Sequence, residues 1–99
     1  MAHAVWTPIA REELEDILYY IAIEDGRPLT AECVYFELRD LADRQAKKPK
    51  TGHRYDGAPV GWLYVRHKRW LLFYQLHSEG IEVMRVVDGV RDLPKLLRD

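Results

Sequence analysis

Cationic and aromatic side chains gather in the second half of this sequence, on segments whose composition predicts β-strands. These residues are Arg66, His67, Lys68, Arg69, Trp70, Tyr74 and Arg85. Cations interleaved with aromatics suit phosphates and stacked bases, and they suit an acidic, aromatic-lined protein surface equally well. Charges at a hairpin tip beside half-buried aromatics of an antiparallel sheet produce the same pattern. The composition therefore indicates a protein that binds another macromolecule, with the class of partner left open.

The residues that could hold a metal or act as nucleophiles are isolated from one another. The histidines stand singly along the chain, at His3, His53, His67 and His77. None is spaced to share a metal ion with another, and the single cysteine, Cys33, has neither a second cysteine nor an evident base nearby. We therefore predict no metal site, no catalytic residue and no disulfide.

A phosphate-binding loop is also not predicted. The sequence GAPVG at residues 57–61 neither follows a strong strand nor opens a helix, which is where a glycine-rich phosphate cradle would have to lie. We therefore expect no nucleotide cofactor.

The net charge of −1 hides an uneven distribution of charge along the chain. Residues 1–49 carry six Lys/Arg and ten Asp/Glu, whereas residues 50–99 carry nine and six. Residues 44–69 hold eight Lys/Arg against Asp56 alone, a net of +7 in 26 residues. A basic cluster on a nearly neutral protein favours a local anionic partner, although a solvated loop with solubilising charges would look the same.

The length and composition predict one globular domain, residues 1–99. Apolar residues make up 47% of the chain and charged residues 31%, and no apolar run approaches the roughly 20 residues that span a bilayer. The first residues, MAHAVW, do not resemble a secretory signal, so we expect a cytoplasmic protein without a membrane segment.

The predicted secondary-structure elements that position these residues indicate an α+β domain. A short strand over residues 3–7 leads into a helix over residues 9–24, with Thr7 as its N-cap and Pro8 at its first position. Thr30 is expected to cap a second helix, which packs on the first as an antiparallel hairpin. An irregular loop follows at residues 47–61, then strands at 62–67, 70–77 and 81–87, and finally a short helix that begins at Asp92 and reaches Leu97.

The connections between the three strands are short enough only for antiparallel hairpins, which predicts a three-stranded antiparallel meander. The last strand does not reveal which of its faces is buried. Ile81, Val83, Arg85 and Val87 alternate with Glu82, Met84 and Val86, so each face mixes apolar and charged side chains. The orientation of Arg85 is therefore left open.

Three large apolar side chains fall on helix faces that a lone hairpin would leave in water. Tyr19 and Ile23 lie opposite the apolar stripe of the first helix, and Phe36 lies opposite that of the second. They predict an apolar patch that a partner chain covers, although scattered surface aromatics are the simpler alternative.

Several sequence segments, in this order of elements, resemble the RelE/ParE toxin superfamily of bacterial type II toxin–antitoxin systems, particularly its ParE branch. The resemblance spans essentially the whole chain. It is carried by DILYYI at residues 16–21, WLLFY at residues 70–74 and IEVMRVVDGVRDLP at residues 81–94. In one departure, Asp88 stands where the family commonly has His.

The resemblance implies a toxin that binds DNA gyrase and is neutralised by a cognate, ParD-like antitoxin. In this interpretation Arg66, Arg69, Arg85, Arg91 and Lys95 contact the target. The antitoxin-binding residues are those of the predicted apolar patch, Tyr19, Ile23 and Phe36.

The RelE branch, which cuts mRNA on the ribosome, is the alternative, and a non-toxic antitoxin-binding module is a third reading. Asp88 argues against cleavage, because a carboxylate beside a scissile phosphodiester repels it unless a metal intervenes. Direct binding of nucleic acid is left open.

Overall fold

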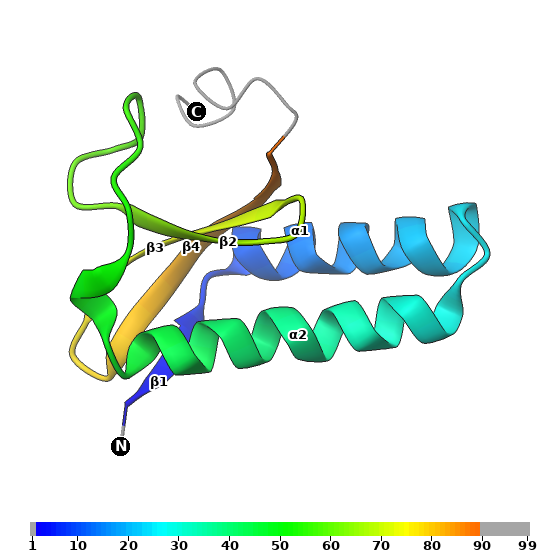
Figure 1. Cartoon of the computed structure of the whole chain (residues 1–99), viewed down its shortest axis with the longest axis horizontal. Helices are drawn as coiled ribbons and strands as arrows, with labels where there is room; N and C mark the ends of the chain where they lie inside the picture. The colour runs from blue at the N-terminus through cyan, green and yellow to red at the C-terminus, as the bar shows by residue number, and fades with distance from the viewer. Residues whose placement is uncertain (1, 90–99) are drawn as a thin grey trace.

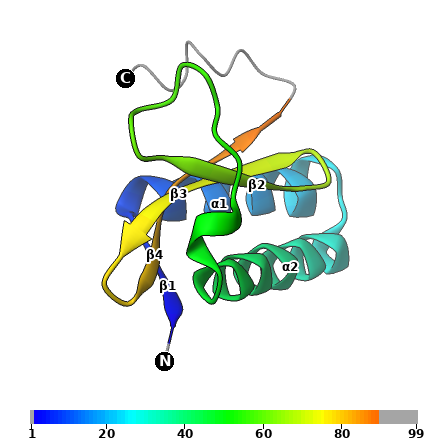
Figure 2. The same cartoon turned by 60° about the vertical axis from the view of Figure 1, so that its left-hand side comes forward.

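The computed structural model describes residues 2–89 and shows a two-layer α+β fold, as predicted. Two helices lie on one face of a four-stranded sheet, and an irregular segment crosses the other face (Figures 1 and 2). The elements follow the chain as β1 (His3–Trp6), α1 (Pro8–Tyr19), η1 (Tyr20–Glu24), α2 (Pro28–Ala46), η2 (Pro49–Thr51), β2 (Leu63–His67), β3 (Trp70–His77) and β4 (Gly80–Asp88). The predicted helix from Asp92 lies outside the described residues.

The strand order in the sheet is β1-β4-β3-β2. Strands β2, β3 and β4 form the predicted antiparallel meander, and β1 pairs parallel with β4. Among the strands of residues 2–89, the last in chain order, β4, therefore lies in the interior of the sheet, between β1 and β3.

The first helix begins as the sequence indicates and changes its pitch near its end. The Thr7 hydroxyl accepts a hydrogen bond from the Ala10 backbone N–H at 3.1 Å, and Pro8 occupies the first turn. From Tyr20 to Glu24 the helix continues as a π-helix, which the Asp25 N–H closes onto the Tyr20 carbonyl at 2.9 Å. The predicted helix over residues 9–24 is thus one continuous helix, whose last turn is the wider π-helical turn.

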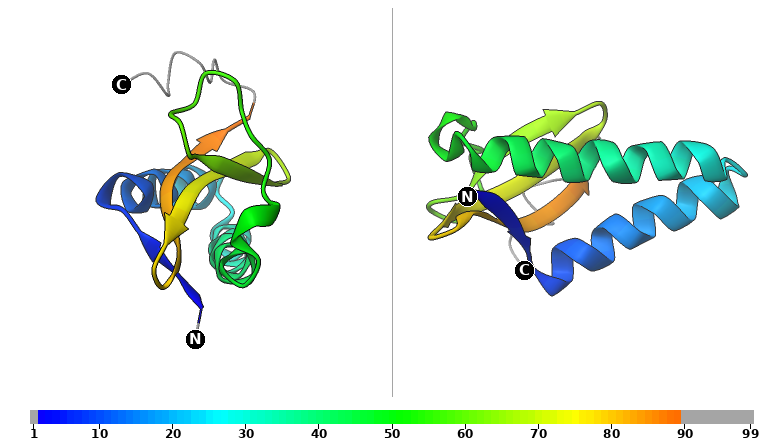
Figure 3. Two further views of the ribbon diagram at one scale, coloured as in Figure 1. Left: turned by 90° about the vertical axis from the view of Figure 1, so that its left-hand side faces the viewer. Right: turned by 90° about the horizontal axis from the view of Figure 1, so that it is seen from below.

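The second helix begins two residues before the predicted cap, so the role given to Thr30 was wrong. Pro28 holds the first turn, because its ring fixes a helical φ and it lacks the N–H that a cap would serve. The Ala31 N–H already donates to the Arg27 carbonyl at 3.0 Å. The sequence periodicity predicts one face made of Val34, Leu38, Leu41 and Gln45, with Ala31 and Ala42 alongside. All of these face the core as buried residues except Leu41, which is half-buried. Figure 3 shows α1 and α2 lying side by side and antiparallel, with the sheet behind them in the right-hand view.

Both faces of β4 carry buried side chains because the strand contains a bulge. Phe73 lies opposite Arg85, but the next residue of β3, Tyr74, lies opposite Val83, so Met84 is an extra residue. The extra residue reverses the alternation, and Val83 and Val86 both join the core under the helices.

A second, smaller core lies on the sheet face away from the helices. Leu71, Phe73 and Val87 are buried there, and Tyr55 and Trp62 of the irregular segment pack over them. The segment over residues 47–61 is mostly without regular structure, as predicted, apart from the short helix η2.

Candidate functional site

An apolar groove runs between the end of the first helix and the start of α2. Its volume is about 480 Å³. Tyr19, Ile23 and Phe36 line it and are 60%, 61% and 61% exposed, so the structure brings together all three residues of the predicted patch. The other residues that line the groove are Leu18, Ala22, Ala31, Glu32 and Tyr35. A partner helix with an apolar face has the shape and chemistry to fill such a groove.

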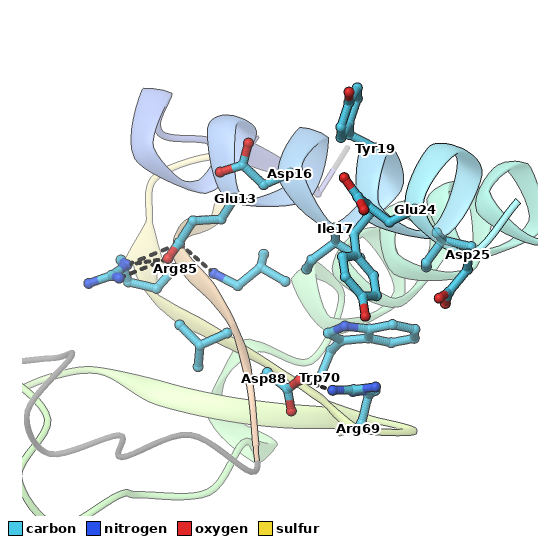
Figure 4. Close-up of a pocket in the computed structure, with 14 residues that line it drawn as sticks. Glu13, Asp16, Ile17, Tyr19, Glu24, Asp25, Arg69, Trp70, Arg85 and Asp88 are labelled. Atoms are coloured by element: carbon cyan, nitrogen blue, oxygen red, sulfur yellow. Dashed lines mark hydrogen bonds and ion pairs between the residues drawn. The ribbon is translucent and has the colours of Figure 1, made fainter. Parts of the chain in front are cut away.

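A larger cleft of about 870 Å³ separates α1 and η1 from the end of β4 (Figure 4). It is rich in carboxylates: Glu13, Asp16, Glu24, Asp25 and Asp88 all line it. Two of the predicted target-binding arginines, Arg69 and Arg85, lie at its sheet side. This cleft could not be predicted from the sequence, because its helical wall ends at Asp25 and its sheet wall begins 44 residues later, at Arg69.

Arg85 is held in the cleft wall by a carboxylate from α1. Its Nε lies 3.0 and 2.9 Å from the two Glu13 oxygens, and its Nη2 lies 2.8 Å from Glu13 Oε2. Glu13 Oε1 also accepts a hydrogen bond from the Val86 backbone N–H at 2.9 Å, on the edge of β4 beyond the end of its pairing with β1. The side chains of Arg85 and Glu13 are only 16% and 21% exposed. The guanidinium is thus already engaged inside the protein.

A family model described as "ParE toxin of type II toxin-antitoxin system, parDE" matches residues 4–93. The chain belongs to the ParE toxin family. The fold is also similar to a solved structure titled "Chromosomal ParDE TA system from P. aeruginosa", with a TM-score of 0.65 and 16% sequence identity. The match covers 89% of this chain and 96% of the other. A comparison with curated proteins finds no match.

In this ParE family member, Asp88 forms an ion pair with Arg69 across the start of β3. The hydrogen bond from Arg69 and the charge of Asp88 raise the pKa of Arg69 above its ordinary value. The side chain of Asp88 is 17% exposed and that of Arg69 is 57% exposed. Asp88 therefore supplies an internal partner for a second arginine of the predicted target-binding set.

The other predicted residues of the toxin lie elsewhere. Arg66 is exposed on the edge strand β2, outside the cleft, and its Nε donates to the Lys68 carbonyl at 2.9 Å. Arg91 and Lys95 lie outside the described residues. Trp70 and Tyr74 are both buried members of the core, and Trp70 also lines the cleft, so these aromatics do not form an exposed stacking surface.

His67 and Lys68, at the tip of the β2–β3 hairpin, both contact a carboxylate on α2. Glu37 Oε1 lies 2.5 Å from His67 Nε2 and 3.1 Å from Lys68 Nζ. The hydrogen bonds from these two partners lower the pKa of Glu37, so its carboxylate stays ionised and links the hairpin to the helix.

Two further observations concern residues 2–89 only. No group of three or more His, Cys, Asp or Glu side chains in this range is placed to hold a metal ion. No helix in the same range has the length and apolar character that a bilayer-spanning segment requires.

Proposed function

We propose that this chain is the toxin of a type II toxin–antitoxin pair, that it inhibits DNA gyrase without hydrolysing a substrate, and that a ParD-like antitoxin neutralises it. Membership of the ParE toxin family supports the toxin role. Gyrase acts on chromosomal DNA, so the proposed site of action is the cytoplasm.

The observation that favours gyrase over mRNA is the pairing of the arginines on the sheet. A ribonuclease of the RelE kind would need such cations to stabilise the charge that builds up on a cleaved phosphate. Arg85 is paired with Glu13 and Arg69 with Asp88, so each guanidinium already faces a carboxylate. A phosphodiester brought to either one would meet a negative charge at the same place.

The proposed target surface comprises Arg66 together with Arg91 and Lys95 near the C-terminus. Arg69 keeps a largely exposed guanidinium and belongs to the same surface, whereas Arg85 contributes by holding β4 against α1. This assignment narrows the role that the sequence analysis gave to Arg85.

Two assays with the purified protein test the target. Supercoiling of relaxed plasmid by gyrase should be inhibited by this chain and restored when the antitoxin is added. Primer extension on mRNA from a cell-free translation reaction should show no new cleavage. Discrete cuts in the ribosomal A site together with unaffected gyrase would reverse the assignment.

The apolar groove between α1 and α2 is the proposed antitoxin site. Replacing Tyr19 and Phe36 with Ser should weaken antitoxin binding, because each change removes a large exposed apolar side chain from the groove. Val60→Ser is the matched control, since Val60 is 96% exposed and lies outside the groove. Isothermal titration with the antitoxin should separate the two variants, and equal affinities would exclude this groove.

A further inference from the structure

A group of cations at the end of α2 takes no part in the surfaces described above. Residues 44–55 contain five Lys/Arg and no Asp or Glu. Arg44 is paired with Asp40 at 2.8 Å. The other four, Lys47, Lys48, Lys50 and Arg54, are exposed, and none forms an ion pair with another residue of the range 2–89. We refer to residues 47–54, which carry these four cations, as the basic turn.

A network of hydrogen bonds, centred on the buried contact between Gln45 and Tyr74, fixes the backbone of the basic turn to the core. Tyr74 Oη donates to the Pro49 carbonyl at 2.7 Å and accepts from Gln45 Nε2 at 2.9 Å. Gln45 Nε2 also donates to Thr51 Oγ1 at 2.9 Å, and this hydroxyl donates to the Lys48 carbonyl at 2.8 Å. Burial raises the pKa of Tyr74, so its phenol keeps the proton that it donates.

The contact between the turn and the core is close enough to require glycine at one position. A Cβ atom on Gly52 would lie 2.2 Å from Tyr74 Oη, well inside contact distance. Next to it, the backbone of His53 pairs with Tyr64, with N–O distances of 2.9 and 2.8 Å, which ties the start of the loop to β2. The inward-facing groups of the turn are thus occupied, and its lysines stand on a fixed backbone. A loop that only adds solubility needs no such anchoring.

The net charge of the chain does not cancel this local field. The acidic residues that follow α1, Glu24 and Asp25, lie beside the connection to α2, at the opposite end of α2 from the basic turn (Figure 1). Nineteen helical residues at about 1.5 Å each separate the two ends by about 28 Å. That is more than three times the Debye length of about 8 Å at physiological ionic strength. Two acidic residues, Asp43 and Asp56, flank the turn in the sequence, so residues 43–56 carry five Lys/Arg against two Asp, a net of +3. A polyanion that approaches the turn therefore still meets a net positive charge.

The chemistry of the turn fits a phosphate backbone better than unstacked bases. Lysine is a compact point charge that binds phosphate without reading sequence. The aromatic rings that follow the turn are engaged elsewhere, because Tyr55 and Tyr64 lie with their ring centroids 5.8 and 5.6 Å from that of Phe73 in the second core. Single-stranded nucleic acids need exposed rings on which bases can stack. Duplex DNA offers instead about one negative charge per 1.7 Å of axis.

We propose that the basic turn binds the phosphate backbone of duplex DNA without sequence preference. Four phosphate contacts predict that log K falls with log salt concentration with a slope of about −3.6. The affinity belongs to the nonspecific class, with Kd of about 10⁻⁴–10⁻⁶ M at physiological salt. If the protein also inhibits gyrase, binding to DNA would concentrate the toxin where its target works.

Fluorescence anisotropy with a labelled 20-base-pair duplex of random sequence tests the proposal on the full chain. Lys48→Gln with Lys50→Gln removes two contacts and should make the slope shallower, from about −3.6 to about −1.8. At 0.1 M salt this change corresponds to a loss of roughly 60-fold in affinity. Arg11→Gln with Arg27→Gln is the matched control. It removes the same charge from exposed positions outside the turn and should change the slope little.

A second pair, Lys47→Gln with Arg54→Gln, should reproduce the effect, and circular dichroism should show that all three variants are folded. Equal losses from the turn variants and the control would overturn the proposal, since they would show that only total charge matters. No binding to the duplex at low salt, or tighter binding to single-stranded RNA, would also overturn it. Neither gyrase nor antitoxin is present in the assay, so the result does not depend on the proposed function.

Discussion

Removal of the Glu13 side chain should destabilise the fold more than removal of any other charged side chain of α1. Glu13 accepts hydrogen bonds from the Arg85 guanidinium and from the Val86 N–H, and so joins α1 to the edge of β4. Glu13→Ala leaves both donors without this acceptor. Val86 is only 2% exposed, so water cannot readily replace the carboxylate at its N–H.

The size of the effect follows from burial. A buried N–H left without an acceptor costs about 1–3 kcal/mol. The ion pair, with side chains 16% and 21% exposed, falls between a surface pair at about 0–1 kcal/mol and a buried pair whose disruption costs about 3–5 kcal/mol. Together these give a loss of about 2–4 kcal/mol. At about 4–8 °C per kcal/mol for a domain of this size, Tm should fall by at least about 8 °C.

Urea denaturation followed by circular dichroism measures this loss, and two variants sharpen the test. Glu13→Gln keeps one oxygen for the Val86 N–H but removes the charge, so it should cost about half as much as Glu13→Ala. Glu15→Ala, on the exposed face of the same helix, should cost under about 0.5 kcal/mol. If Glu13→Ala is no more destabilising than Glu15→Ala, or if the Gln variant is as unstable as the Ala variant, the carboxylate does not cap the strand edge.

Three further changes test other parts of the structure. Tyr74→Phe should lower the free energy of unfolding by about 1–3 kcal/mol and speed hydrogen exchange in the basic turn, because the Pro49 carbonyl loses its donor. Unchanged exchange would show that other contacts fix the turn. Glu37→Gln should destabilise the protein at pH 7, because the lowered pKa of Glu37 means that its ionised carboxylate stabilises the fold above the ordinary glutamate value of about 4.3. The difference from the unchanged protein should shrink steadily as pH falls below that value and through the folded pKa, and a difference that stays constant with falling pH would contradict this. Arg91→Ala with Lys95→Ala should abolish gyrase inhibition while urea denaturation shows little loss of stability, and full inhibition by this variant would place the target surface elsewhere.

The elements of this fold could be predicted from the sequence because their signals are local. Thr7 and Pro8 mark the start of α1, and two- and three-residue connections leave only antiparallel hairpins for β2, β3 and β4. The buried face of β4 could not be predicted, because the bulge at Met84 changes the alternation and depends on pairing with β3. The parallel pairing of β1 with β4 joins segments at opposite ends of the chain, which no local pattern records.

The candidate surfaces likewise include residues whose exposure could be predicted from the sequence and contacts that could not. Helical periodicity was enough to predict that Tyr19, Ile23 and Phe36 would be exposed, and the structure places them in one groove. The partner of Arg85 could not be predicted, since Glu13 is 72 residues away. A cationic side chain on a strand therefore indicates a binding residue only when no carboxylate of the same chain forms an ion pair with it.

The position of β4 inside the sheet has a consequence for synthesis of the protein. Among the described strands β1 is made first, but its hydrogen-bonding partner β4 is made last, and Thr7 Oγ1 donates to a carbonyl 77 residues later, that of Met84. Until Gly80–Asp88 has been translated, β1 and β3 have no strand between them, and the helices have no complete surface to pack on. Contacts of such long range also slow folding. Interruption of translation before Gly80–Asp88 therefore leaves a fragment in which β2 and β3 can still pair but β1 has no partner strand.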